Sequence, residues 1–148
     1  MSMNQILSGM DISASGLAGE RMRMEVAANN IANVHSTRSA DGGPYRRQQV
    51  TFAASMSNFL NPGAVGVDGL QGVQPVAVSD DTSPLPLVYD PGHPDANAEG
   101  FVVMPNVQLP VEMVDMVTAS RAYEANLKSL ETFRQLAEQA LALLRGTR

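Results

Sequence analysis

Apolar side chains recur at alternating steps of four and three residues along the N-terminal stretch of the chain. This spacing averages about 3.5 residues, the repeat of a helix that packs against another helix along one stripe. We therefore predict a helix over residues 4–32, with Ser2 and Gln5 at the spacing of an N-terminal capping box. Arg21 is the only charged member of the stripe, which comprises Met3, Leu7, Met10, Ala14, Leu17, Arg21, Met24, Ala28 and Ile31.

The C-terminal stretch has the same pattern and predicts a second helix over residues 109–144. Its stripe comprises Leu109, Met113, Met116, Ser120, Tyr123, Leu127, Leu130, Arg134, Ala137, Leu141 and Leu144. A further apolar stripe lies beside it and includes Ala119, Ala122, Phe133, Leu136, Ala140 and Leu143. Two stripes need burial on two sides, which pairing with one helix of the same chain cannot provide. Pro110 is compatible with a helix only in the first turn, so the helix must begin near Leu109.

Proline and glycine interrupt the chain between these two stretches. Eight of the nine prolines and eight of the twelve glycines lie between Val34 and Asn106, so this region cannot be mainly helical. Short β-favouring runs predict strands at residues 45–53, 73–78, 85–89 and 101–104, and residues 58–72 predict a mobile loop. The predicted fold is mainly α with a small β-rich middle: residues 1–34 and 106–148 form a coiled-coil-like hairpin domain, and residues 35–105 form the middle region.

Three glycines lie inside the first predicted helix. Gly9, Gly16 and Gly19 each cost about 1 kcal/mol relative to alanine in a helix interior. Close approach of a neighbouring element explains their presence, while the simpler alternative is that they only weaken the isolated helix. The two explanations are compatible.

Composition and charge exclude several classes of function. The net charge is −5 and the densest positive spot is the pair Arg46 and Arg47, which we interpret as a strand surface rather than a nucleic-acid site. The absence of cysteine excludes disulfides and thiol chemistry. Neither a secretory signal peptide nor a membrane span is expected, because no apolar run approaches the necessary length.

Motifs for catalysis or metal binding are also missing. His35 and His93 are far apart and lie beside turn residues, and Asp80, Asp81, Asp90 and Asp95 do not follow the spacing of an EF-hand. The glycines at positions 63, 66, 69 and 72 lack the Gly-Lys-Ser/Thr sequence of a phosphate-binding loop. We therefore predict a protein that is not an enzyme, with no catalytic residues, no cofactor and no metal.

Several segments, in order along the chain, resemble one known family. Residues 28–33 (ANNIAN) resemble the N-terminal signature of the axial proteins of the bacterial flagellum. Residues 42–48 (GGPYRRQ), 87–97 (LVYDPGHPDAN), 104–107 (MPNV), 112–116 (EMVDM) and 120–126 (SRAYEAN) are similar to the proximal-rod proteins of the flagellar basal body. Pro86, in the predicted strand at 85–89, and Pro110, at the start of the second helix, depart from the family pattern.

The resemblance implies a structural subunit of the proximal rod, the drive shaft that crosses the periplasm and transmits torque. It implies export by the flagellar type III apparatus without a cleaved signal peptide, and assembly with copies of itself and with other rod proteins that have similar terminal helices. Neither nucleic acid nor a membrane span is expected. The alternative, a cytoplasmic helical-hairpin adaptor, has the same helices but needs no export.

The expected assembly interface consists of residues in the apolar stripes and of asparagines in these motifs. Asn29, Asn30 and Asn33 cannot remain unpaired in a buried joint, so we expect them to bond backbone groups where the first helix ends. The interface residues that we predict are Leu7, Met10, Leu17, Met24, Asn30, Ile31, Asn33, Met113, Met116, Tyr123, Asn126, Leu127, Leu130 and Leu141.

Overall fold

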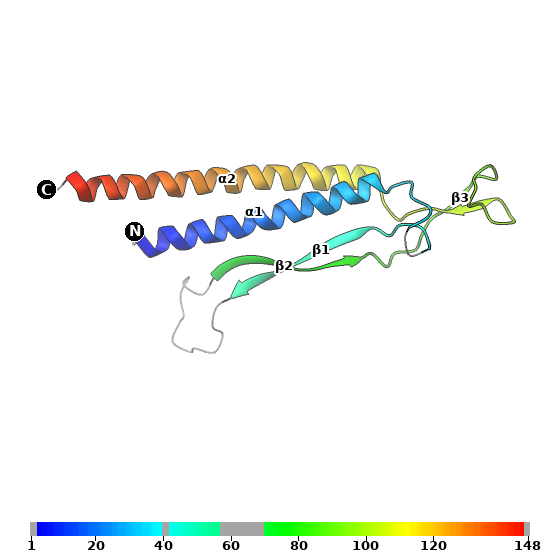
Figure 1. Cartoon of the computed structure of the whole chain (residues 1–148), viewed down its shortest axis with the longest axis horizontal. Helices are drawn as coiled ribbons and strands as arrows, with labels where there is room; N and C mark the ends of the chain where they lie inside the picture. The colour runs from blue at the N-terminus through cyan, green and yellow to red at the C-terminus, as the bar shows by residue number, and fades with distance from the viewer. Residues whose placement is uncertain (1–2, 40–41, 57–69, 147–148) are drawn as a thin grey trace. The chain divides into compact units, whose positions relative to one another are not determined.

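Two long helices enclose four strands in the sequence of the chain. The computed structural model describes residues 3–39, 42–56 and 70–146, with side chains described at 9–39, 42–54 and 72–143. The elements are α1 (Met3–Ala32), β1 (Gln48–Met56), β2 (Leu70–Asp80), β3 (Leu87–Tyr89), β4 (Phe101–Val103) and α2 (Leu109–Gly146) (Figure 1). The predicted class, mainly α with a small β-rich middle, is confirmed.

The predicted element bounds are close to the observed ones. Both helices begin within a residue of their predicted starts, and Pro110 lies in the first turn of α2 as expected. The first strand begins at Gln48 rather than Tyr45, because the Tyr45 amide donates to Ser36 O at 2.9 Å in a turn. The predicted loop at 58–72 falls mostly outside the described residues, as does Ser2 of the predicted capping box.

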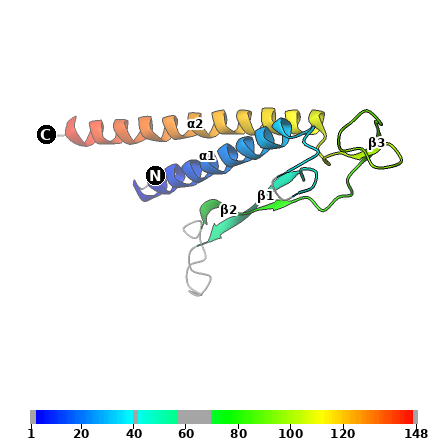
Figure 2. The ribbon, with the colours of Figure 1, turned by 45° about the vertical axis from the view of Figure 1, so that its right-hand side comes forward.

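The strands form two small sheets. β1 pairs with β2, and the arrows of Figures 1 and 2 run in opposite directions. The Asp81 amide extends this pairing by donating to Arg47 O at 2.7 Å. β3 pairs with β4 in antiparallel register, with Leu87 opposite Val103 and Tyr89 opposite Phe101. The Met104 amide donates to Pro86 O at 2.9 Å, so Pro86 takes part in the ladder as an acceptor and the strand forms despite it.

The contacts of the chain gather into two compact units. The first comprises Met1–Met22, Phe52–Val76 and Ala119–Arg148, and the second comprises Arg23–Thr51 and Ala77–Thr118. Each unit contains a part of both helices and of the β1–β2 hairpin. The expectation that residues 1–34 and 106–148 act as an assembly domain concerns the polymer and stays a prediction.

In the first unit, glycines let α1 approach its neighbours closely. A Cβ atom at Gly9 would lie 2.9 Å from Phe133 Cζ, and one at Gly16 would lie 2.9 Å from Asn126 Nδ2. Because the contacts advance by seven residues on α1 and retreat by seven on α2, the helices are antiparallel with a heptad repeat. The interpretation of these glycines as points of close approach is confirmed.

The β1–β2 hairpin packs on a different side of α1 in the same unit. A Cβ atom at Gly19 would lie 3.2 Å from the ring of Phe52. Gly72 has a φ of +93°, and a side chain there would overlap Ser15. Ser15 Oγ donates to Ile12 O at 2.7 Å and accepts from the Val73 amide at 3.1 Å. Small residues therefore line two sides of α1.

The buried stripe on each helix differs from the predicted one. At every second position, the more buried residue is the one just before the predicted residue. Along α2 the more buried positions are Glu112, Met116, Ala119, Tyr123, Asn126, Leu130, Phe133 and Ala137. On α1, Met10, Leu17, Met24 and Ile31 are half-buried, but Ala14, Arg21 and Ala28 are exposed. Met113, Leu127 and Leu141, which belong to the predicted stripe of the second helix, are exposed within the chain, Met113 by 55%. Polar and small side chains occupy those inner positions, and hydrophobic periodicity does not detect them.

Replacing Gly9 with leucine should lower the free energy of unfolding by about 1–3 kcal/mol, because the added side chain meets the Phe133 ring. Ala14→Leu, on the exposed side of the same helix, should change it by less than about 0.5 kcal/mol. Urea unfolding followed by circular dichroism measures both. Equal stability of the two variants would contradict the close approach of α2 at Gly9.

Candidate assembly site

Asn30 is the most completely bonded side chain in the second unit. It is 1% exposed. Its Nδ2 donates to Gln48 O at 2.8 Å and to Glu112 Oε2 at 2.9 Å. Its Oδ1 accepts from the Tyr45 hydroxyl and from the Gln48 amide, both at 2.9 Å. These bonds use the full donor and acceptor capacity of a carboxamide, so Asn30 joins α1, the start of β1 and α2 at one point.

An ion-pair network adjoins Asn30. Arg47 Nε donates to Glu112 Oε1 at 2.5 Å, and its terminal nitrogens lie 3.8 Å from Asp81 Oδ2 and 3.5 Å from Asp115 Oδ2. The Glu112 side chain is only 2% exposed. Arg23 extends the network by donating to Asp115 Oδ1 at 3.2 Å. The hydrogen bond to Glu112 raises the pKa of Arg47 above its ordinary value, so the guanidinium stays charged.

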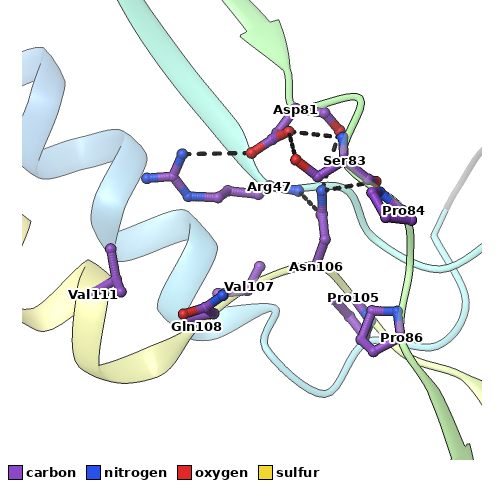
Figure 3. Close-up of a pocket in the computed structure, with 10 residues that line it drawn as sticks. All are labelled: Arg47, Asp81, Ser83, Pro84, Pro86, Pro105, Asn106, Val107, Gln108 and Val111. Carbon is purple, nitrogen blue, oxygen red and sulfur yellow. Dashed lines mark hydrogen bonds and ion pairs between the residues drawn. The ribbon is translucent and has the colours of Figure 1, made fainter.

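Tyr45 and Asn106 hold the backbone around this network. Burial raises the pKa of Tyr45, and the carboxylates of Asp80 and Glu112 raise it further, so its hydroxyl stays protonated and can donate to Asn30. The Arg47 amide donates to Asn106 Oδ1 at 2.8 Å. Asn106 Nδ2 lies 3.2 Å from Asp81 O and 3.5 Å from Ser83 O, and Figure 3 shows these bonds. We call Asn30, Tyr45, Arg47, Asn106 and Glu112 the polar joint.

Part of the polar joint is predicted by the sequence. Asn30 bonds backbone groups of Gln48, and Asn33 Nδ2 donates to Asn29 O at 2.9 Å, so the expectation is confirmed for Asn30 and Asn33. The Asn29 side chain is exposed, so the expectation of a buried amide is wrong there. The interpretation of Arg47 as strand surface is wrong, because carboxylates surround it. Glu112 was missed, although a carboxylate two residues after Pro110 on an apolar helix start was a usable signal.

The other predicted interface residues differ in how exposed their side chains are. Asn126 is half-buried against Gly16, while Met113, Leu127 and Leu141 are exposed. The side chain of Leu7 lies outside the described residues. The half-buried members are Met10, Leu17, Met24, Ile31, Asn33, Met116, Tyr123 and Leu130. The structure therefore divides the set, and the role of these residues in assembly stays a prediction.

In the first turns of α2, charged side chains face the interior and apolar side chains face solvent, which is the reverse of an ordinary surface helix. Glu112 is buried in the polar joint, and Asp115 is paired with Arg23 and Arg47. Met113 and Val114, in contrast, are 55% and 65% exposed. An amphipathic helix normally places its charges outward and its apolar residues inward. The inversion leaves an apolar outer face, which we define by Leu109, Val111, Met113, Val114 and Val117.

The residues that could suggest chemistry serve local structure instead. His93 Nδ1 accepts from the Asp95 amide at 3.1 Å, and Asp90 Oδ1 accepts from the Gly92 amide at 3.1 Å. His35 lies in a turn, as predicted. Over the described residues, no group of three or more His, Asp or Glu side chains is placed to hold a metal ion. None of the helices, over the same residues, carries an apolar run long enough to cross a membrane.

Two long helices, a polar joint between distant segments and exposed apolar helix faces are features of structural subunits that assemble with other chains. Residues 10–38 match the family described as "Flagella basal body rod protein", and residues 98–143 match "Flagellar basal body rod FlgEFG protein C-terminal". The first match contains Asn30, and the second contains Asn106 and Glu112. The polar joint therefore lies mainly where the two matched segments meet.

Comparisons with individual proteins over most of the chain identify one group of rod proteins as its relatives. The chain is 43% identical to the flagellar basal-body rod protein FlgC of Borreliella burgdorferi, over 95% of this chain and 99% of that one. It is 41% identical to FlgC of Salmonella typhimurium (93% and 97% covered) and 39% identical to FlgC of Bacillus subtilis (90% and 95% covered). The chain belongs to the FlgC family of flagellar basal-body rod proteins and is a structural subunit of the rod. The adaptor alternative is not favoured.

Glu112→Ala should destabilise the protein by about 3–5 kcal/mol, because it leaves the half-buried Arg47 without its closest partner and the buried Asn30 without an acceptor. Urea unfolding measures the change. The matched control is Glu131→Ala, which removes an exposed pair with Lys128 on the same helix and should cost less than about 1 kcal/mol. Similar losses in both variants would show that the joint carries no special weight.

The Asp81 carboxyl should titrate below its ordinary pKa. Hydrogen bonds from Ser83 Oγ at 2.5 Å and from the Ser83 amide at 2.8 Å lower the pKa, and the charges of Arg47 and Arg46 lower it further. A depressed folded-state pKa stabilises the fold above the unfolded pKa, and this stability is lost as the pH falls through the folded value. Ser83→Ala should raise the pKa of Asp81, which carbon-13 NMR titration measures. An unchanged titration would contradict the assigned cause.

Proposed function

We propose that this subunit polymerises through its terminal helices into the proximal part of the rod, with copies of itself and with other rod proteins as neighbours. The rod in this proposal is the shaft that spans the periplasm and transmits torque, and the subunit performs no catalysis. The observation that carries the proposal is the inverted start of α2. Its charged residues are held inward by the polar joint, while Met113, Val114 and Val117 face solvent.

An exposed apolar helix face of this kind supports assembly for an energetic reason. Burying apolar surface contributes about 25 cal/mol per Å², and monomeric proteins rarely leave contiguous apolar patches in water. The polar joint prevents α2 from turning this face inward, because rotation would expose Glu112 and orphan Asn30. Leu127 and Leu141 provide exposed apolar side chains farther along the same helix. These residues are available to neighbouring subunits.

Met113→Asp and Leu127→Asp should each reduce incorporation into isolated basal bodies at least tenfold and abolish swimming. Placing a carboxylate in a buried interface costs several kcal/mol, and about 1.4 kcal/mol corresponds to a tenfold change in association. The helicity of the purified variants should remain that of the parent, because both side chains are exposed within the chain. Quantitative blotting of basal bodies and motility agar measure the result.

Ser129→Asp is the matched control, since Ser129 is exposed on the same helix and its hydroxyl donates to Ala125 O of that helix. It should incorporate and swim normally. Normal swimming of both Met113→Asp and Leu127→Asp would reject polymerisation through the terminal helices.

Export is the other component of the proposal. We propose that the flagellar type III apparatus delivers the subunit without cleavage of a signal peptide, as the family resemblance implies. In cells that lack the export ATPase and gate, the full-length chain should accumulate in the cytoplasm. A periplasmic pool in those cells, or a shortened N-terminus on subunits recovered from basal bodies, would contradict this route.

A further inference from the structure

The β3–β4 hairpin in the second unit displays an apolar face. Side chains alternate across a strand, so the register places Leu87, Tyr89, Phe101 and Val103 on one face and Val102 on the other. Val102 is buried, whereas Leu87 and Tyr89 are 63% and 65% exposed. Tyr89 packs edge-on against Phe101 with ring centroids 5.2 Å apart. We call these four exposed residues the hairpin face.

A cavity of about 530 Å³ lies elsewhere in the same unit, between the turn after β2 and the start of α2. Figure 3 shows Pro86, Pro105 and Val107 along one side and Arg47 with Asp81 along the other. Val111 also lines the cavity and belongs to the apolar outer face of α2, so the two surfaces are continuous. Cavities of about 300–1,000 Å³ are large enough to take up an organic group the size of an aromatic side chain.

The chemistry of the cavity favours an apolar occupant. Arg47 is engaged by Glu112, Asp81 and Asp115, and Asn106 bonds the chain on both of its polar atoms. Among the described residues, no buried side-chain nitrogen or oxygen lacks a partner. The charged and amide groups of Arg47, Asp81 and Asn106 are therefore already engaged within the chain, while Pro86, Pro105 and Val107 supply apolar surface to the cavity.

Exposed charges of opposite sign lie at the edges of the two surfaces. Asp90 and Glu99 lie beside the hairpin face and are exposed. Arg46, which is also exposed, donates to Asp81 O at 3.3 Å beside the cavity. Opposite charges at the rim of an interface orient the partners and suppress wrong pairings. The acidic rim of one surface thus matches a basic residue at the other.

We propose that the hairpin face of one copy docks into the proline-lined cavity of a second copy, with Tyr89 entering beside Val111. This inference deepens the proposed polymerisation and rests on it. A contact between two identical surfaces closes a dimer and stops, whereas a contact between two different surfaces can add further copies and builds a ring or an open helical array. One docking event of this kind buries the hairpin face and the cavity together and extends the polymer.

Cysteine cross-linking tests the contact, because the chain contains no native cysteine. Tyr89→Cys and Val111→Cys are produced as two differently tagged copies in the same cells, and isolated basal bodies are oxidised with copper phenanthroline. A disulfide requires Cα atoms about 4.4–6.8 Å apart, so it reports direct contact. We expect a dimer that carries both tags, and no dimer from either variant alone. The control pair, Tyr89→Cys with Ser129→Cys, should give none.

The outcomes separate this contact from the wider proposal. Both variants present in basal bodies without a mixed dimer would overturn the docking and leave the rod function intact. A dimer of Tyr89→Cys with itself would also overturn it, because the contact would then join identical surfaces. Absence of the unmodified chain from basal bodies would instead reject the rod proposal.

A charge exchange covers the case in which the cysteine variants fail to assemble. Arg46→Glu and Glu99→Arg should each lower incorporation at least several-fold, and the doubly substituted chain should recover it. Arg46 also donates to Asp81 O, which Asn106 bonds as well, so the recovery in the double variant, and not the loss in a single one, reports the contact between copies. If the double variant incorporates no better than the single ones, the proposed pairing of the two surfaces is wrong.

Discussion

The arrangement of the second unit depends on the four hydrogen bonds of Asn30. A buried carboxamide that loses a partner costs about 1–3 kcal/mol, so the positions of Tyr45, Gln48 and Glu112 are all constrained by one side chain. Arg47 then neutralises Glu112, and Asn106 fixes the backbone of Arg47. The end of α1, the start of β1 and the start of α2 therefore form one interdependent joint.

The polar joint fixes which residues of α2 face solvent. Because Glu112 and Asp115 must point toward Arg47, the valines and Met113 between and beyond them must point outward. Contiguous apolar patches of this kind are rare on monomeric proteins, which is why we propose this face as a contact with neighbouring subunits. Internal polar bonding and external apolar exposure are thus two results of the same helix orientation.

Close packing in the first unit is achieved by different means. Gly9, Gly16 and Gly19 let an aromatic ring or an amide lie against the backbone of α1, and Gly72 adopts a positive φ against Ser15. Few large apolar side chains are enclosed there, so contact depends on backbone proximity rather than on a thick core. Large apolar residues of α2, such as Leu127 and Leu141, remain exposed.

The two long helices, the β-rich middle and the family are predictable from the sequence, because helix periodicity, proline placement and motif order are local properties of the chain. The sequence also indicates that glycines in α1 mark close approach and that Asn30 and Asn33 bond backbone groups. The inward orientation of Glu112, the outward orientation of Met113 and the carboxylates around Arg47 are visible only in the folded chain. Hydrophobic counting assigns polar residues to the surface, whereas here hydrogen-bond partners from distant segments make burial of Asn30, Arg47 and Glu112 favourable.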